Sequence, residues 1–306
     1  MHPDHVIEVD AIRKAYGPTV AAADVSFTVR RGEIFGLIGP NGAGKTTTME
    51  CVEGLRAPDA GRIRVLGLDP ERDRRALQLR IGVQLQEAQL QKRIKVREAV
   101  AFWESLYPTA AEGGTLLRQL GLHDKRDAWF MTLSGGQKQR LFIALALVND
   151  PEVVFLDELT TGLDPQARRA IWDLVRGIRD RGKTVFLTTH LMEEAERLCD
   201  RVAILDHGRI IDMDRPAALV ERHCPQRTVV VATDFPAAAD RFEAVPSATA
   251  VRREGDRHMI DGRGDDLITD VIHTISEHRM PVSEFRTVLP TLEDVFLTLT
   301  GRSIRA

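Results

Sequence analysis

A glycine-rich segment that ends in a lysine and a threonine has the composition of a phosphate-binding loop. Residues 39–46 read GPNGAGKT and lie between an apolar stretch, 34–38, and a segment of helical character. Glycines let the backbone N–H groups approach phosphate oxygens closely, and the N-terminus of a helix adds partial positive charge. Lys45 can reach the β- and γ-phosphates, and the Thr46 hydroxyl can ligate Mg²⁺. We therefore predict a nucleoside triphosphate site formed by Gly39, Pro40, Asn41, Gly42, Ala43, Gly44, Lys45, Thr46 and Thr47.

Two adjacent carboxylates follow a second apolar segment. Asp157 and Glu158 come directly after Val153–Leu156. Neighbouring side chains of a strand point to opposite sides, so the two acids are expected to have different roles. Asp157 is suited to hold Mg²⁺, and Glu158 to polarise the attacking water as a general base. Such acids on their own are more often solvated, but their position downstream of a phosphate-binding loop favours catalysis.

A third segment contains a serine and two glycines at the start of an apolar helix. Residues 133–137 read LSGGQ, and the apolar character continues to Val148. A hydroxyl, backbone N–H groups and a helix N-terminus together make a second anion site. Ser-Gly-Gly in isolation is a common linker. A protein with one phosphate-binding loop needs a second γ-phosphate site only if two copies face each other, and the residues predicted for it are Ser134, Gly135, Gly136 and Gln137.

The elements that must position these residues alternate between strands and helices. We expect antiparallel strands over Val6–Val29 around a turn at Gly17-Pro18, buried strands at Ile34–Ile38, Val153–Leu156 and Thr184–Thr188, a helix from about Lys45, and helical periodicity over Val96–Leu122. Strands that alternate with helices predict a mostly parallel sheet that is covered on both faces.

The pattern changes beyond about Arg222, which predicts a first domain at 1–222 and a small one at 223–306. The expected order is β-α-β-β-α-β, typical of an α+β ferredoxin-like domain. Its elements are a strand at Thr228–Thr233, a helix at Ala237–Phe242, a hairpin of Ala248–Arg252 and His258–Asp261, a helix at Leu267–His278 and a strand at Val282–Val288. A last helix, Thr291–Thr300, has a threonine at its N-cap.

Composition excludes several other classes of protein. The 306 residues are 43% hydrophobic and 28% charged, as in ordinary globular proteins, and the net charge of −3 gives no reason to expect nucleic acid as a partner. The three cysteines, at 51, 199 and 224, lack metal-ligand spacing and are expected to be reduced. The longest apolar run, Leu141–Val148, is far short of the ~20 residues that a membrane span needs.

Taken together and in this order, the motifs of residues 6–215 resemble those of ABC-type ATPases. The resemblance implies an α/β P-loop NTPase domain with antiparallel β and α-helical subdomains. It also implies that ATP and Mg²⁺ bind, and that two ATPase subunits, either two copies or this chain with a homologous subunit, sandwich two ATP molecules. A separate integral membrane permease is the expected further partner, which would place the chain at the cytoplasmic face of a bacterial plasma membrane.

The resemblance assigns roles to four further residues. Tyr16 matches the aromatic residue that stacks on adenine, and Asp164 matches the aspartate that communicates between subunits. Gln86 matches the glutamine that senses Mg²⁺ and the membrane partner, with Gln84 as the neighbouring candidate. His190 matches the histidine that contacts the γ-phosphate; a lone histidine at a strand end is more often structural, but this context reverses that expectation.

One position departs from the family pattern. The family usually has proline after the catalytic glutamate, whereas this chain has Leu159. Leucine restores a backbone N–H and frees φ, so we expect a less rigid loop around Glu158 and a changed rate, with activity retained.

The C-terminal tail indicates which group of ABC-type ATPases the chain resembles. Residues 290–302, PTLEDVFLTLTGR, look like the ending of ATP-binding subunits of two-component exporters, the group that includes daunorubicin-resistance pumps. Coupling to the permease is expected through the region after Gln86, where residues 90–96 lead into the helical part.

The competing interpretations of the chain's function are a non-transport ABC ATPase that acts on a soluble macromolecule and a regulatory nucleotide-binding protein. The absence of sustained heptads and of Cys-x-x-Cys weighs against the DNA-acting forms, and Glu158 with His190 weighs against a protein that does not hydrolyse ATP. The cargo stays open.

Overall fold

The computed structural model describes residues 4–85, 89–264 and 266–301. By its internal contacts the chain divides into two compact units, residues 1–216 and 217–306. Each unit is described by itself. Among the described residues, no helix is both long enough and apolar enough to cross a membrane.

The first unit begins with a three-stranded antiparallel sheet. Two of its strands are those that the alternating pattern of residues 6–29 predicts, and the third was not predicted. Strands β1 (His5–Tyr16) and β2 (Thr19–Arg30) form a hairpin, and β4 (Ala60–Val65) pairs with the other edge of β1. The turn between β1 and β2 contains Gly17 with φ of 57°, a left-handed conformation that glycine adopts without strain.

A six-stranded sheet forms the centre of the unit, with strand order β5-β6-β7-β3-β8-β9. Its strands are β3 (Ile34–Ile38), β5 (Ile81–Gln84), β6 (Val153–Asp157), β7 (Thr184–Thr189), β8 (Arg201–Asp206) and β9 (Arg209–Asp214). All neighbours are parallel except β8 and β9. The register aligns Ile38 with Thr189 and Asp157 with Thr188, so the loops that follow β3, β6 and β7 leave the same edge of the sheet.

Phenylalanine rings join the two sheets. Phe27 of β2 stacks on Phe35 of β3 and on Phe186 of β7, with ring centroids 5.4 and 5.6 Å apart. All three rings are buried. Aromatic contacts of this kind stabilise a core beyond the area that they bury, so they fix the antiparallel sheet against the central one.

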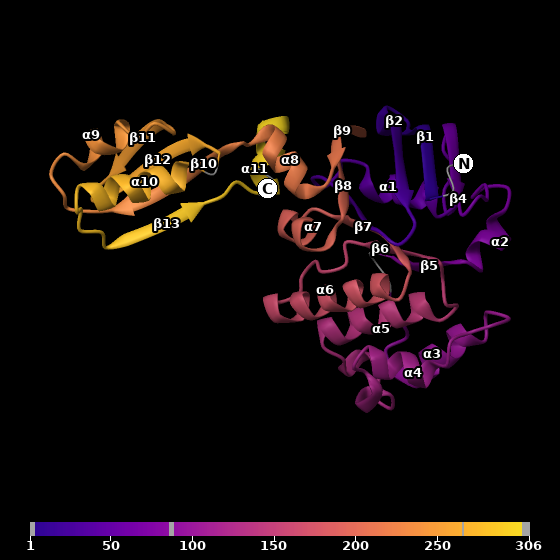
Figure 1. The fold of residues 1–306 in the computed structure, drawn as a ribbon. Helices are drawn as coiled ribbons and strands as arrows, with labels where there is room; N and C mark the ends of the chain where they lie inside the picture. Colours follow the sequence, from indigo (N-terminus) through magenta and orange to yellow (C-terminus); the bar gives the residue numbers. More distant parts are fainter. Residues whose placement is uncertain (1–3, 86–88, 265, 302–306) are drawn as a thin grey trace. The chain divides into compact units, whose positions relative to one another are not determined.

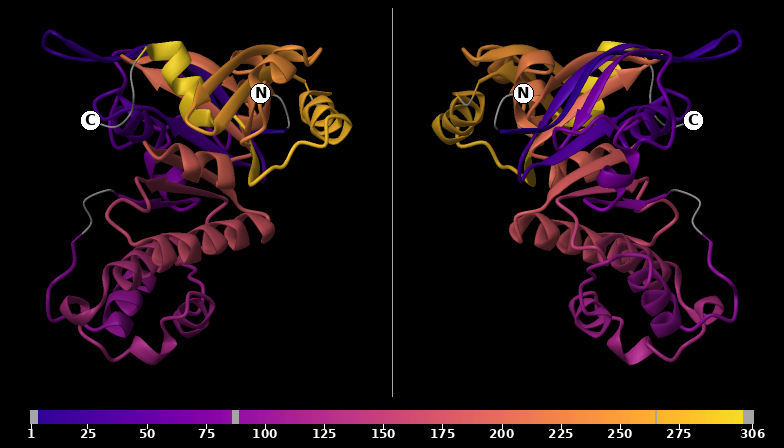
Figure 2. Two further views of the ribbon diagram at one scale, coloured as in Figure 1. Left: turned by 90° about the vertical axis from the view of Figure 1, so that its left-hand side faces the viewer. Right: turned by 90° about the vertical axis from the view of Figure 1, so that its right-hand side faces the viewer.

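Helices flank the central sheet and extend away from it. These helices are α1 (Lys45–Val52), α2 (Arg74–Gln78), α3 (Val96–Glu104), α4 (Gly113–Gln119), α5 (Gly135–Leu147), α6 (Pro165–Asp180) and α7 (Met192–Leu198). Helices α3 and α4 lie on the far side of α5 and α6 from the sheets (Figure 1). Figure 2 shows this helical part at the end of the unit opposite the β1–β2 hairpin.

The region of predicted helical periodicity, Val96–Leu122, is two helices with a break between them. Helix α3 ends at Glu104 and α4 begins at Gly113. Pro108 lies within the break. Proline lacks the N–H that a helix interior requires and disfavours helical geometry at the preceding residue, which explains the interruption.

The second unit contains a four-stranded antiparallel sheet in the order β11-β12-β10-β13. Its elements are α8 (Pro216–His223), β10 (Gln226–Ala232), α9 (Ala238–Glu243), β11 (Ala248–Glu254), β12 (Arg257–Arg263), α10 (Asp266–Glu277), β13 (Glu284–Val288) and α11 (Leu292–Thr300). Between β10 and β13 the predicted β-α-β-β-α-β order is confirmed. Thr291 caps α11 as predicted, because its side chain accepts a hydrogen bond from the backbone N–H of Asp294.

Candidate active site

The glycine-rich loop wraps tightly around the start of helix α1. Gly44 has φ of 103°, and a Cβ atom at this position would collide with the carbonyl oxygen of Ala21, so only glycine fits. Lys45 is 4% exposed, and its ammonium group donates hydrogen bonds to the carbonyls of Gly39 and Pro40 at 2.9 and 3.0 Å. Burial lowers the pKa of Lys45, while the charges of Glu158 and Asp157 oppose that shift. The loop therefore holds a mostly buried ammonium group, and a cation in such a setting attracts an anion more strongly than it does in water.

Asp157 is the last residue of β6 and is buried, with 4% of its surface exposed. The Thr188 hydroxyl of the neighbouring strand donates a hydrogen bond to its carboxylate. Burial raises the pKa of Asp157, whereas hydrogen bonds from the Thr188 and Thr46 hydroxyls lower it. The carboxylate of Asp157 and the hydroxyl of Thr46 are hard oxygen donors, the kind of ligand that Mg²⁺ prefers.

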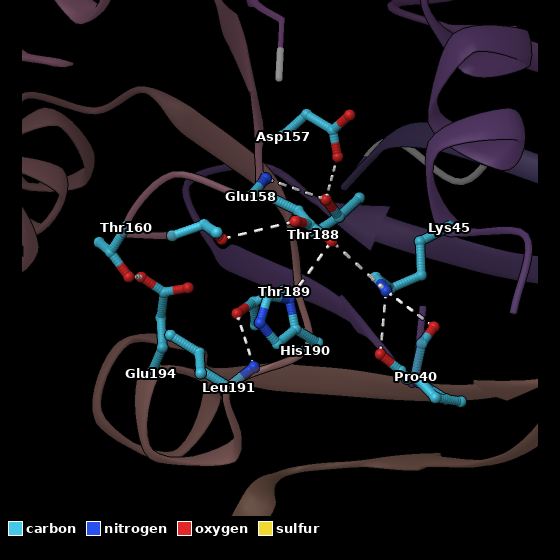
Figure 3. A network of polar contacts seen from close by, with 12 residues as sticks. Pro40, Lys45, Asp157, Glu158, Thr160, Thr188, Thr189, His190, Leu191 and Glu194 are labelled. Atoms are coloured by element: carbon cyan, nitrogen blue, oxygen red, sulfur yellow. Dashed lines mark hydrogen bonds and ion pairs between the residues drawn. The ribbon is translucent and has the colours of Figure 1, made fainter. Parts of the chain in front are cut away.

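Glu158 begins the loop after β6 and lies among groups from three other parts of the fold (Figure 3). Its Oε1 atom lies 3.7 Å from Lys45 Nζ and 3.3 Å from His190 Nδ1, and Thr161 Oγ1 donates to its Oε2 atom at 3.4 Å. Its backbone has φ of 46°, a left-handed conformation that costs a non-glycine residue free energy. The structure therefore brings the predicted catalytic pair, Glu158 and His190, into contact beside the phosphate-binding lysine.

A cavity of about 310 Å³ unites the loop, Glu158 and Tyr16. Its lining residues are Tyr16, Ala21, Asn41, Gly42, Gly44, Lys45, Thr46, Thr47 and Glu158. The ring of Tyr16 is 41% exposed, and the Arg56 guanidinium lies 5.3 Å from its centre. The exposed ring at the rim offers a flat apolar surface of the kind on which a purine base stacks.

The Ser-Gly-Gly segment lies elsewhere in the first unit, beside Asp164. Ser134 caps helix α5 and forms a capping box with Gln137, as its side chain accepts from the Gln137 N–H at 3.3 Å. A Cβ atom at Gly136 would lie 3.2 Å from that of Ala167 in the first turn of α6, and Asp164 caps α6 by accepting from the Ala167 N–H at 2.8 Å. Ser134 and Asp164 are exposed. Within the described part of the chain, residues 134–137 do not line the cavity.

Of the two glutamine candidates, Gln86 falls outside the described residues. Gln84 is 4% exposed, and its Nε2 atom donates to the Leu85 carbonyl at 2.7 Å.

The sequence analysis missed several residues that support Glu158. Thr188 contacts Asp157, its hydroxyl also accepts from the Glu158 N–H at 3.2 Å, and Thr161 contacts the Glu158 carboxylate. Aligning the two apolar strands in parallel would have found Thr188, since it pairs in register with Asp157. Glu194, the third residue of α7, accepts hydrogen bonds from Thr160 and Trp172, and no local motif in the sequence indicates this role.

A phosphate-binding loop that faces two carboxylates at the edge of a parallel sheet defines a nucleoside-triphosphate-hydrolysing fold. A family model described as ABC transporter matches residues 22–161. Nod factor export ATP-binding protein I of Paraburkholderia xenovorans (strain LB400) is 40% identical over 311 aligned residues, which cover 99% of each chain. The chain belongs to the ABC transporter family, as the ATP-hydrolysing subunit of an exporter.

Solved structures of ABC transporter subunits share this fold. One is cbiO1 from Clostridium perfringens, described as part of the ABC transporter complex cbiONQ. It is 28% identical, with a TM-score of 0.65 over 72% of this chain and 96% of that chain. Another is MJ0796, described as a bacterial ABC transporter cassette with a dimeric structure. It is 25% identical, with a TM-score of 0.61 over 68% of this chain and 98% of that chain.

Proposed function

We propose that Glu158 is the general base of ATP hydrolysis in this exporter subunit, with His190 as the residue that contacts the γ-phosphate. The observation that carries this assignment is the position of the Glu158 carboxylate, on the wall of the cavity that the phosphate-binding loop also lines. His190 Nδ1 is 3.3 Å from that carboxylate and can orient it. A carboxylate in this position accepts a proton from water as the water attacks the γ-phosphate.

The other groups of the site bind and orient ATP in this proposal. The backbone N–H groups of residues 41–47 and the ammonium group of Lys45 hold the phosphates, and Tyr16 stacks on the adenine. Mg²⁺ would be held by Thr46 and Asp157, with Gln86 as a further predicted ligand, and would neutralise charge on the phosphates. The buried Asp157 carboxylate and its hydroxyl neighbours support this choice of metal.

In the proposed mechanism, each ATP site is completed by residues of a second ATPase subunit. The exposed Ser134 and Gly135 and the partly buried Gly136 and Gln137, together with Asp164, would act on the ATP that is held by the other subunit. Their absence from the described lining of the chain's own cavity supports this role, as does the dimeric cassette of similar fold. The partner is a second copy or a homologous ATPase subunit. ATP binding closes the dimer, and hydrolysis followed by product release reopens it.

The permease contact is proposed on the helical part of the first unit, at the cytoplasmic face of a bacterial plasma membrane. Large apolar side chains are exposed there: Phe102, Leu106, Trp129 and Met131 are 46–57% exposed. Exposed apolar side chains that gather on one region mark protein interaction surfaces. The predicted route through residues 90–96 leads into this region. Because curated relatives that are 38–40% identical are named for Nod factor export, Nod factors are the first cargo class to test.

The small domain is proposed to have a ferredoxin-like fold at residues 223–306, after an ATPase domain at 1–222. The β-α-β-β-α-β order and the strand order β11-β12-β10-β13 support the fold. The division into compact units six residues before the proposed boundary supports two domains.

Co-purification tests the transporter assignment. The Glu158→Gln variant, tagged and expressed in its native cell, is extracted from membranes with mild detergent, and bound proteins are identified by mass spectrometry. Glu193→Gln, at an exposed acid on α7, is the matched control. We expect a stoichiometric polytopic membrane protein with both variants. Recovery only with ribosomes, DNA or no partner would favour the non-transport class.

A further inference from the structure

A buried carboxylate lies behind the catalytic loop, on the side away from the cavity. Glu194 of α7 is 1% exposed. Its Oε1 atom accepts hydrogen bonds from the Thr160 hydroxyl at 2.8 Å and from the Trp172 indole N–H at 3.0 Å. Among the ion pairs of the described residues, none involves Glu194, so neutral donors alone compensate its burial. Burying a carboxyl group away from water costs free energy that its hydrogen bonds only partly offset, which points to a role other than stabilising the fold.

The two hydrogen bonds join three elements that adjoin the site. Thr160 is 0% exposed and lies two residues after Glu158, in the loop that leads to Asp164. Trp172 lies on α6, the helix that Asp164 caps. Glu194 itself lies four residues after His190. Figure 3 shows Thr160 and Glu194 facing each other on the far side of Glu158 from Lys45.

The loop that Thr160 anchors is held in a strained conformation. Glu158 has φ of 46°, and its backbone carbonyl accepts from the Thr161 N–H at 3.3 Å, in a tight turn. Position 159 is leucine, so the chain lacks the φ restraint that proline would supply there. A strained backbone persists only where the surroundings hold it, and the Thr160–Glu194 hydrogen bond anchors the loop two residues after Glu158.

We propose that Glu194 is a positioning residue for ATP hydrolysis, which acts through Thr160 to hold the Glu158 loop in its hydrolytic geometry. This inference rests on the proposed role of Glu158. Both partners of the Thr160–Glu194 hydrogen bond lie close in sequence to the proposed reacting groups. Thr160 comes two residues after Glu158, and Glu194 comes four residues after His190. Without the Thr160–Glu194 hydrogen bond, the Glu158 carboxylate moves away from His190. This slows hydrolysis but does not weaken the binding of ATP by the phosphate-binding loop.

Paired substitutions separate this role from a merely structural one. Thr160→Val is nearly isosteric and removes only the hydroxyl donor to Glu194, while Thr160→Ser retains it. Trp172→Phe is the matched control. It removes the other hydrogen bond to Glu194 Oε1, but the substituted residue lies in α6 and not in the loop after Glu158. In the full-length chain, kcat and KM for ATP, ATP affinity and the midpoint of thermal unfolding are measured for each.

We expect Thr160→Val to lower kcat about tenfold with KM and ATP affinity within about twofold, and Thr160→Ser to restore kcat. Trp172→Phe is expected to lower the unfolding midpoint to a similar degree but to leave kcat within about twofold. Equal loss of kcat in Thr160→Val and Trp172→Phe, in proportion to lost stability, would overturn the proposal.

Glu158→Gln is measured in the same series to separate this proposal from the role on which it depends. If Glu158→Gln is inactive and Thr160→Val keeps wild-type kcat, the positioning role of Glu194 alone is refuted. If Glu158→Gln keeps wild-type turnover, the general-base assignment falls, and the positioning role falls with it. In the Glu158→Gln background the Thr160→Val change is expected to leave the residual rate unaltered, because there is then no general base to misplace.

Discussion

The Oε1 atom of Glu158 lies 3.3 Å from Nδ1 of His190, although the two residues are 32 positions apart in the chain. Glu158 follows β6 and His190 follows β7, and these strands are parallel neighbours in register. The contact thus follows from the parallel pairing of β6 and β7, which places the residues after both strands at the same edge of the sheet. Lys45 Nζ is 3.7 Å from the same carboxylate oxygen, so the proposed base, the histidine and the lysine of the glycine-rich loop lie together.

Removing the imidazole is expected to slow hydrolysis strongly. His190→Ala removes one of the contacts that orient Glu158 and one of the proposed donors to the γ-phosphate. Loss of such a preorganised donor lowers kcat by about 10²-fold, while ATP affinity changes by only about twofold. Steady-state ATPase assays together with equilibrium binding of a fluorescent ATP analogue check this. His207→Ala, which alters an exposed histidine of the same unit, is the control and is expected to retain wild-type kcat. A His190→Ala enzyme of normal kcat would refute the contact's role.

Tyr16 is expected to contribute to the affinity for ATP and not to the chemical step. Its ring lines the cavity and is 41% exposed. Tyr16→Ala removes the stacking surface and should raise the dissociation constant for ATP about fivefold to tenfold, with kcat at saturation unchanged, whereas Tyr16→Phe should bind normally. Isothermal titration calorimetry measures the constants. Equal affinities in all three proteins would show that adenine binds elsewhere.

Glu53 makes stability depend on pH. It is 2% exposed at the end of α1, and its Oε1 atom has no hydrogen-bond partner among the described residues. Burial raises the pKa of Glu53 well above 4.5, and the charges of Asp157 and Glu50 add to the shift. Because the pKa is higher in the folded state, folding takes up a proton. Stability is therefore lost as pH rises from the unfolded pKa of 4.5 through the higher folded value.

Glu53→Gln has no proton to lose, so its stability should lack this component. Between about pH 5 and about pH 8, the thermal unfolding midpoint of the wild type should fall relative to that of the variant by roughly 3 °C. Differential scanning calorimetry at several pH values measures the difference. Glu254→Gln, at an exposed acid, should track the wild type. A constant gap between wild type and Glu53→Gln at every pH would contradict the buried, protonated state.

Leu159→Pro tests how far the catalytic loop tolerates the residue that the family usually has. Leu159 is 2% exposed, so proline removes buried apolar atoms but leaves Asp157 and Glu158 in the chain. We expect ATPase activity within about tenfold of wild type, since proline restrains φ at position 159, restricts the backbone of Glu158 and removes one N–H but keeps both carboxylates. The ATPase rate and the unfolding midpoint are both measured. Complete inactivation of a folded variant would show that the left-handed Glu158 backbone cannot precede proline here.

Much of the site could be predicted because its chemistry resides in contiguous motifs. The phosphate-binding loop, Asp157 and Glu158 each follow an apolar strand, and the parallel sheet brings strand ends together by its topology alone. Thr188 and Glu194 could not be found in this way. Their roles depend on which strand neighbours β6 and on how α7 packs, and both are long-range properties. Hydrophobic periodicity likewise predicts a helix over residues 96–122. The structure has a break around Pro108, because a single proline interrupts a helix without changing the periodicity of the apolar residues.

The ATPase rate of Glu158→Gln tests the central claim most directly. The purified full-length variant is compared with the wild type and with Glu193→Gln for phosphate release at saturating ATP and Mg²⁺, beside binding of ATP at equilibrium. Glutamine keeps the shape of the side chain but cannot accept the proton of the attacking water. We predict retained ATP binding, turnover at least about 10²-fold below wild type, and accumulation of a closed ATP-bound dimer on gel filtration. Turnover comparable to wild type would contradict the assignment of Glu158 as the general base.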